Sequence, residues 1–128
     1  MRYVIDAHAW INYLIGNDIG KKIASIIENA ENEIFTDIIT ISEVISVIKR
    51  ENRDYEEAYN VLVSLSKIYP ITLDFAKETG LLHAELKKRI KDFGLADSFI
   101  LLTANKINAK VITGDEHFKS FKNVLFMN

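Results

Sequence analysis

The sequence predicts a three-layer α/β domain, in which a central, mainly parallel sheet is covered by helices. Short runs of β-branched and aromatic residues alternate along the chain with longer amphipathic segments. The short runs are apolar along their whole length, as in parallel strands buried on both faces. The 128 residues, 48% of them hydrophobic, match the size of one ordinary domain, so we expect a single domain over residues 1–128.

The first elements are expected to be a strand and two helices. Residues 2–5 are a short buried strand of β-branched and aromatic type. Residues 7–15 place apolar side chains at helical spacing, and Gly16 ends that helix. Asp18 is the expected cap of a second amphipathic helix, which covers residues 19–30.

A second strand is expected over residues 33–36. Asp37 or Thr40 is then placed to cap a helix that runs to Lys49 and Arg50, whose positive charges suit the negative end of a helix dipole. Asp54 opens a further amphipathic helix.

The middle of the chain contains its only proline, Pro70, followed by a short segment over residues 71–73. Asp74 is the expected cap of a long helix that runs to Ile90 and that Gly94 ends. Gly80 within this helix weakens the prediction of an unbroken helix.

The last third of the chain again alternates helices with short apolar strands. Asp97 begins or caps an apolar helix that ends at Ile107, and residues 110–113 form a strand. A short helical turn over residues 116–120 and a final strand over residues 124–127 complete the prediction.

Composition excludes several classes of protein. The absence of cysteine excludes a disulfide scaffold, thiolate zinc sites and cysteine nucleophiles. No stretch approaches the roughly 20 apolar residues that span a bilayer, and no secretory signal is recognisable, so we expect no membrane contact and a cytoplasmic location. The net charge of −2 gives no general attraction to nucleic acid, so a polyanionic substrate would need a local basic patch or bound cations.

Four acidic residues are candidates for a metal site. Asp6 follows the first strand and Asp115 follows the 110–113 strand, so both carboxylates should emerge at the carboxyl edge of the sheet. Glu43 and Asp97 lie among apolar residues, where an unpaired charge is costly. Clustered carboxylates repel one another unless a cation offsets them, and oxygen ligands select Mg²⁺ or Mn²⁺.

Each of these acids also has an ordinary structural explanation. The three aspartates are placed to be helix N-caps, and Glu43 to lie on the polar face of its helix. The histidines are too scattered for a zinc site: we expect His117 at the surface and His83 on the polar side of its helix, while His8 could line the site beside Asp6.

Four blocks of sequence carry a family resemblance. They are Val4-Ile5-Asp6-Ala7, Ile41-Ser42-Glu43-Val44, Leu95-Ala96-Asp97-Ser98-Phe99-Ile100, and Ile112-Thr113-Gly114-Asp115 followed by His117-Phe118. In order, spacing and total length the chain resembles the PIN-domain nucleases, in particular the VapC-type toxins of toxin–antitoxin pairs. The resemblance covers nearly the whole chain and implies a PIN-like fold.

The resemblance also implies an activity and a set of site residues. The chain would be a Mg²⁺- or Mn²⁺-dependent ribonuclease whose acidic metal-binding positions are Asp6, Glu43, Asp97 and Asp115. Thr113 matches a hydroxyl residue that often precedes the last Asp by two places. His8 departs from the Ser, Thr or Asn that many family members carry two residues after the first Asp.

The resemblance further implies an RNA substrate, an antitoxin partner and a homodimer. The residues that would contact RNA phosphates are Lys49, Arg50, Lys88 and Arg89, for which solvated helix ends are the alternative. The residues that would form an aromatic groove for an antitoxin helix are Trp10, Tyr13, Tyr55 and Tyr59, for which core packing is the alternative.

Three other functions are alternatives to a VapC-type toxin. A housekeeping PIN nuclease would use the same acids without an antitoxin, and a PIN fold without catalysis would serve as an interaction module. A phosphotransferase with Asp6 as nucleophile needs a second acid two residues later, where His8 stands.

Overall fold

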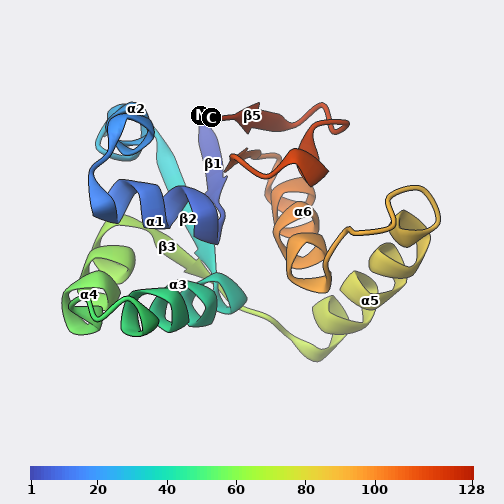
Figure 1. Cartoon of the computed structure of the whole chain (residues 1–128). Coiled ribbons are helices and arrows are strands. Elements are labelled where there is room, and N and C mark those ends of the chain that lie inside the picture. The colour runs from blue at the N-terminus through green and yellow to red at the C-terminus, as the bar shows by residue number, and fades with distance from the viewer.

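The computed structural model describes residues 1–128 and contains one sheet of five strands, all parallel, in the order β3-β2-β1-β4-β5 (Figure 1). The strands are β1 (Arg2–Ile5), β2 (Glu33–Asp37), β3 (Lys67–Tyr69), β4 (Lys110–Thr113) and β5 (Val124–Phe126). The α-helices are α1 (Ala7–Ile15), α2 (Asp18–Ile27), α3 (Ile38–Arg50), α4 (Tyr55–Leu65), α5 (Leu73–Lys87) and α6 (Leu95–Ile107), and a 3₁₀ turn, η1, covers Glu116–Phe118. None of the helices has the length and apolar composition needed to cross a membrane.

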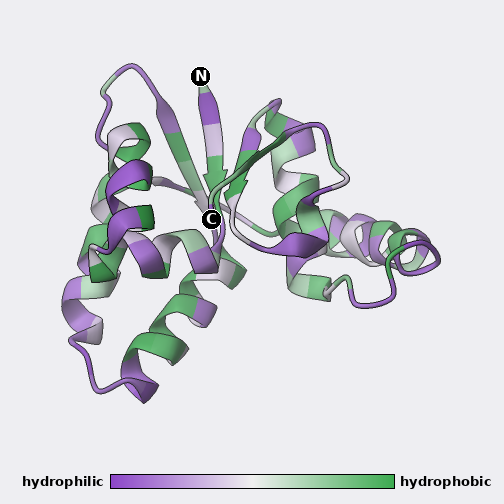
Figure 2. Cartoon of the chain, turned by 45° about the horizontal axis from the view of Figure 1, so that its top comes forward, coloured by the Kyte–Doolittle hydropathy of each residue, from purple (hydrophilic) through white to green (hydrophobic).

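The sheet has a hydrophobic core on each of its faces. Ile5 and Ile112 point to one face, where they pack with residues of α1 to α4. Their neighbours Val4 and Val111 point to the other face, toward α6, α5 and the buried ring of Phe93. The hydrophobic residues of the strands therefore lie between two groups of helices, as Figure 2 shows. The predicted three-layer α/β fold is confirmed.

Two of the predicted helix caps were placed one or two residues too late. The Asn17 side chain, not that of Asp18, accepts the Gly20 N–H at 2.8 Å and caps α2. The Thr72 hydroxyl, not Asp74, accepts the Phe75 N–H at 3.1 Å and caps α5. In both cases the capping residue has extended backbone dihedrals and the predicted Asp is already inside the helix, where its charge suits the positive end of the helix dipole.

Gly94 begins a helix rather than ending one. Helix α5 runs unbroken through Gly80 and stops at Lys87, and Gly94 holds the N-cap position of α6 with extended dihedrals. Asp97 is accordingly the third residue of α6, where its carboxylate accepts the Gly94 N–H at 3.3 Å. Asp97 therefore does not begin this helix and is not its N-cap residue, but its side chain takes part in the capping by accepting the N–H of the N-cap residue. Helix α2 likewise ends at Ile27, short of the predicted Ala30.

The strand β3 was missed by the sequence analysis. It has three residues at the edge of the sheet and stops directly before Pro70. A proline cannot donate to a sheet, so it limits the strand to a length at which apolar periodicity carries no signal.

Trp10 is fully buried and takes part in a chain of hydrogen bonds through the core. Its indole N–H donates to the Thr36 hydroxyl at 2.9 Å, which donates to the Ser66 hydroxyl at 2.8 Å, which donates to the Leu62 carbonyl at 2.6 Å. Trp10 therefore belongs to the core and is not available to a partner.

Candidate metal centre

The carboxyl ends of the three central strands meet at one edge of the sheet. The register of β1 with its two neighbours places Asp6, directly after β1, between Asp37 of β2 and Thr113 of β4. Strand order also reverses between β1 and β4, because the chain first builds outward through β2 and β3 and then returns to add β4 on the other side. Such a switch point is where open parallel sheets bind ligands.

Asp6 is buried at the centre of this edge, with 6% of its surface exposed. One carboxylate oxygen accepts the Ala9 N–H at 2.8 Å and caps α1, so the capping explanation is correct. Burial raises the pKa of Asp6 to about 7, and the charges of Asp97 and Asp115 add to this effect. Hydrogen bonds from the Thr113 hydroxyl and from Ala9 offset it only in part.

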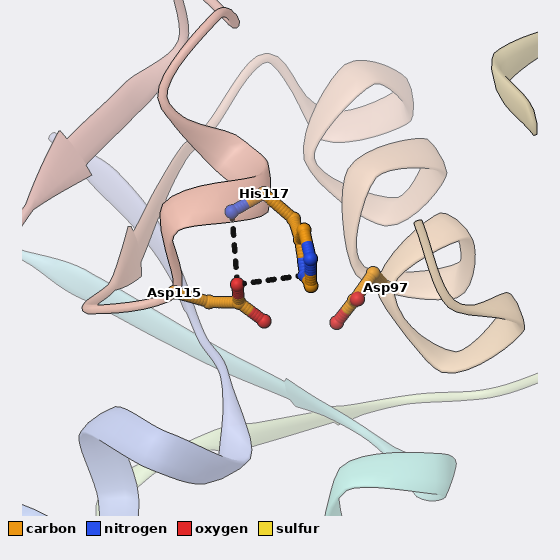
Figure 3. Close-up of side chains that lie close together, drawn as sticks. All are labelled: Asp97, Asp115 and His117. Carbon is orange, nitrogen blue, oxygen red and sulfur yellow. Dashed lines mark hydrogen bonds and ion pairs between the residues drawn. The ribbon is translucent and has the colours of Figure 1, made fainter. Parts of the chain in front are cut away.

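Asp115 and His117 lie in the turn that follows β4 (Figure 3). The same carboxylate oxygen of Asp115 accepts the His117 N–H at 2.9 Å and lies 2.9 Å from His117 Nδ1. The Asp115 N–H donates to the Thr113 hydroxyl at 2.9 Å. The turn is thus held by hydrogen bonds on both sides of Asp115. We predicted His117 at the surface. Its side chain is only partly exposed, because the ring packs against Asp115.

Asp97 faces this pair from the first turn of α6 (Figure 3). One ligand atom from each of Asp97, Asp115 and His117 lies within 4.8 Å of the other two. Burial raises the pKa of Asp97, and the nearby charge of Asp115 raises it further. These three side chains form the most compact group of potential metal ligands.

Glu43 lies at the rim of the site and not inside it. Thr40, Val44 and Ile48 are the buried side of α3, and Glu43 is an exposed residue beside this stripe. Nearby atoms still desolvate its carboxylate enough to raise its pKa, and the charges of Asp97 and Asp37 add to the effect. Glu43 is therefore within electrostatic range of the acidic group without belonging to its compact part.

Asp37 is a fifth carboxylate at this edge of the sheet, and it was predicted only as a helix cap. It does cap α3, because one oxygen accepts the N–H and the hydroxyl of Thr40, both at 3.1 Å. The residue is fully buried, its other oxygen has no partner, and burial raises its pKa. Asp37 lies at the carboxyl end of a central strand, as Asp6 does, and this position in the sequence could have indicated that it belongs to the site.

His8 borders the acidic edge from α1. Its ring lies against Gly114, where a Cβ atom would be only 2.6 Å from His8 Cε1. Gly114 directly precedes Asp115, so the lack of a side chain there makes room for the imidazole. His83, by contrast, is partly buried away from this edge, and its Nε2 lies 3.0 Å from the Phe93 carbonyl oxygen.

The family model for the PIN domain matches residues 3–124 of the chain. The chain belongs to the PIN domain family. The predicted resemblance is thereby confirmed for the family and its fold. No curated protein matches the sequence.

Several solved PIN-fold structures are similar over nearly the whole length of both chains. VapBC2 from Rickettsia felis, bound to a promoter DNA fragment, has a TM-score of 0.75 at 18% identity and covers 100% of each chain. The sarcin–ricin loop cleaving toxin VapC20 of Mycobacterium tuberculosis has a TM-score of 0.80 at 11% identity, covering 98% of this chain and 99% of that one. A toxin–antitoxin complex from Klebsiella pneumoniae has a TM-score of 0.72 at 23% identity, covering 96% and 95%.

The donor atoms of this PIN domain fit a divalent cation. Burial and neighbouring acidic groups raise the pKa of Asp6, Asp97 and Glu43, so the protein itself does not stabilise the charged forms of these carboxylates, and a bound cation would. Two carboxylates and an imidazole within 4.8 Å are donors that such an ion accepts.

The basic residues predicted to contact RNA are exposed, and the two at the end of α3 lie more than one helical turn from Glu43. Lys49 and Arg50 end α3, about 9 Å along the helix axis from Glu43, and the Lys49 ammonium lies over the Tyr55 ring, 5.5 Å from its centroid. Lys88 pairs with Glu85 at 3.1 Å, next to the exposed Arg89. Any contact with RNA would therefore be made by a strand that extends beyond the acidic edge.

Proposed function

We propose that this PIN domain is a divalent-metal-dependent endoribonuclease and the toxin of a VapBC-type pair. The observation behind the proposal is the convergence of acidic charge at the carboxyl edge, where Asp6, Glu43 and Asp97 all have raised pKa values and Asp115 adds to the field. Such an edge repels a polyanion such as RNA until a cation offsets it. The ion is therefore expected to bring substrate and protein together.

The residues that would hold the cation are Asp6, Asp97 and Asp115, with Glu43 acting directly or through water. A bound Mg²⁺ or Mn²⁺ supplies an acidified water and neutralises charge on the phosphodiester. The protein's part is to hold the carboxylates still: the Ala9 N–H fixes Asp6, the Gly94 N–H fixes Asp97, and the Thr113 hydroxyl anchors the backbone of Asp115. Fixed ligands avoid reorganisation during the reaction.

Removing the metal or Asp97 should stop RNA cleavage. A panel of defined RNAs should be cut with Mg²⁺ or Mn²⁺ and left intact with EDTA. Asp97→Asn should lower the rate by about 10²-fold or more, because it removes a charged ligand. Asp74→Asn makes the same chemical change at an exposed position of α5 and should cut at the wild-type rate. Equal cleavage with and without EDTA would contradict the proposal.

A groove between α1, α2 and α4 is the proposed docking site for the antitoxin. The cavity has a volume of about 940 Å³, and its apolar lining includes Tyr13, Leu14, Val61 and Leu65. Tyr55 and Tyr59 are exposed but do not line it. Support for an antitoxin comes from the similar structures, several of which are toxin–antitoxin complexes. An amphipathic helix of the partner would lay its apolar face in such a groove.

A charged side chain placed in this groove should weaken the binding of the antitoxin. Leu65→Asp introduces a carboxylate into the apolar lining and should raise the dissociation constant of the complex by roughly 10-fold or more. The partner to use is a VapB-type antitoxin that inhibits the wild-type protein, and the assay is its inhibition of RNA cleavage. Val63→Asp makes a similar change at an exposed position of α4 outside this lining and is the matched control. Equal loss of inhibition in both variants would argue against this groove.

We also propose that the protein forms a homodimer. Leu73, Leu81 and Leu95 are more than half exposed on α5 and at the start of α6, and a second copy that packed on these two helices would bury them. Sedimentation velocity measures this directly, and a monomer at micromolar concentration would contradict it.

A further inference from the structure

The imidazole of His117 lies beside the two carboxylates that face each other at the acidic edge (Figure 3). Its Nδ1 atom is 2.9 Å from Asp115 Oδ1, and a ring nitrogen shares the 4.8 Å group with Asp97. The His117 side chain is 39% exposed, so it is open to solvent on one side.

The fold holds His117 in this position. Its backbone N–H is bonded to Asp115, and the next residue, Phe118, is fully buried with its ring 5.3 Å from that of Phe93. The backbone of the η1 turn is therefore anchored in the core on one side and to Asp115 on the other. A rotation of the imidazole away from the acids would have to break the contact with Asp115.

We propose that His117 supplies a nitrogen ligand to the cation, together with Asp97 and Asp115, and that this shifts the preference of the site from Mg²⁺ toward Mn²⁺. The inference rests on the proposed metal-dependent activity and specifies the ligands of the same site. Mg²⁺ prefers oxygen donors, whereas imidazole favours transition-metal ions. A site that mixes oxygen and nitrogen donors therefore gains more affinity for Mn²⁺ than for Mg²⁺.

The observed distance is compatible with shared coordination. Two neighbouring ligands of an octahedral ion with bonds of about 2.1 Å are about 3.0 Å apart. The 2.9 Å between His117 Nδ1 and Asp115 Oδ1 matches this value, and it equally matches an ordinary N–H···O hydrogen bond. The ion would take the place of the proton in that bond, so a decisive experiment has to detect the metal–nitrogen bond itself.

Pulsed electron paramagnetic resonance of the Mn²⁺-loaded protein provides this measurement. We expect the echo modulation of a directly bound ¹⁴N imidazole, replaced by the ¹⁵N pattern when histidine alone is labelled. His117→Gln should lose the modulation, and His8→Gln, which changes the other histidine at this edge, should keep it. Calorimetry should show His117→Gln binding Mn²⁺ about 10-fold more weakly, with Mg²⁺ affinity changed by less than about 3-fold.

Each outcome decides the proposal. Mn²⁺ binding without nitrogen modulation in the wild type would overturn the role of His117 and leave the metal-dependent nuclease intact. Modulation lost in His8→Gln and kept in His117→Gln would also overturn it. Absence of any Mn²⁺ binding would overturn this inference and the proposed function together. If His117→Gln fails to fold, the labelled His8→Gln protein gives the answer, because His117 is then the remaining histidine at this edge, and loss of the modulation in His8→Gln would overturn the proposal.

Discussion

Replacing Asp6 by Asn should abolish RNA cleavage and at the same time stabilise the metal-free protein. Cleavage should fall by about 10³-fold or more, because the variant lacks the buried charge at the centre of the proposed ligand set. Stability should rise, because Asn forms the same cap with the Ala9 N–H without burying a charge beside Asp97 and Asp115. If Asp6 served only as a helix cap, its replacement by Asn would neither abolish cleavage nor stabilise the protein.

The stability difference should depend on pH in a defined direction. The folded state raises the pKa of Asp6 from its ordinary 3.8 to about 7, so well below pH 3.8 the carboxyl is neutral in both the folded and the unfolded state and does not destabilise the fold. As the pH rises from about 4 to 7 the unfolded chain releases this proton first, and the metal-free wild type loses roughly 4 kcal/mol of unfolding free energy at most. We expect Asp6→Asn to recover about half of that loss above pH 7.

Thermal unfolding at pH 4.5 and pH 8, with EDTA, measures this difference. The variant should melt above the wild type at pH 8 and close to it at pH 4.5, and added Mn²⁺ should stabilise the wild type more than the variant. Asp54→Asn is the matched control, because Asp54 caps α4 through the Glu57 N–H at an exposed position and should show no gain. Wild-type cleavage by Asp6→Asn under Mn²⁺ would refute the assignment of Asp6.

Sequence patterns predicted this fold well because its elements are defined locally. The buried strands and the amphipathic helices each carry their own periodicity, and Asp37 and Asp54 cap the helices that follow them as expected. Errors arose where the signal is weak: β3 is too short to show a period, and Gly94 could equally end a helix or begin one.

Part of the site was predictable, because two of its residues directly follow strands that the sequence defines locally. Asp6 and Asp115 follow strands, so the parallel sheet alone brings them to one edge. The position of His117 depends on how a three-residue turn folds back on Asp115, and the exposure of Glu43 depends on which face of α3 packs on the sheet. Both follow from tertiary packing, which spacing along the chain does not encode.

Replacing Gly20 by Ala should destabilise the protein by about 3 kcal/mol, against the usual preference of helices for Ala. A Cβ at this position would lie 2.0 Å from the Asn12 carbonyl oxygen, 2.8 Å from its carbon and 3.2 Å from Tyr13 Cα. All three are backbone atoms of α1, so the clash cannot be relieved by a side-chain rotation. Helices α1 and α2 would have to move apart at their crossing.

Gly80→Ala is the matched control for this substitution. Gly80 lies inside α5, where a Cβ would meet no atom within 4 Å, so helix propensity alone should stabilise this variant by up to about 1 kcal/mol. Urea unfolding of the two variants should thus give changes of opposite sign. A Gly20→Ala protein as stable as the wild type would show that α1 and α2 are not in the contact described. Because Asp6 is the N-cap of α1, the displacement of α1 in Gly20→Ala should also lower metal affinity, whereas Gly80→Ala should leave metal affinity unchanged.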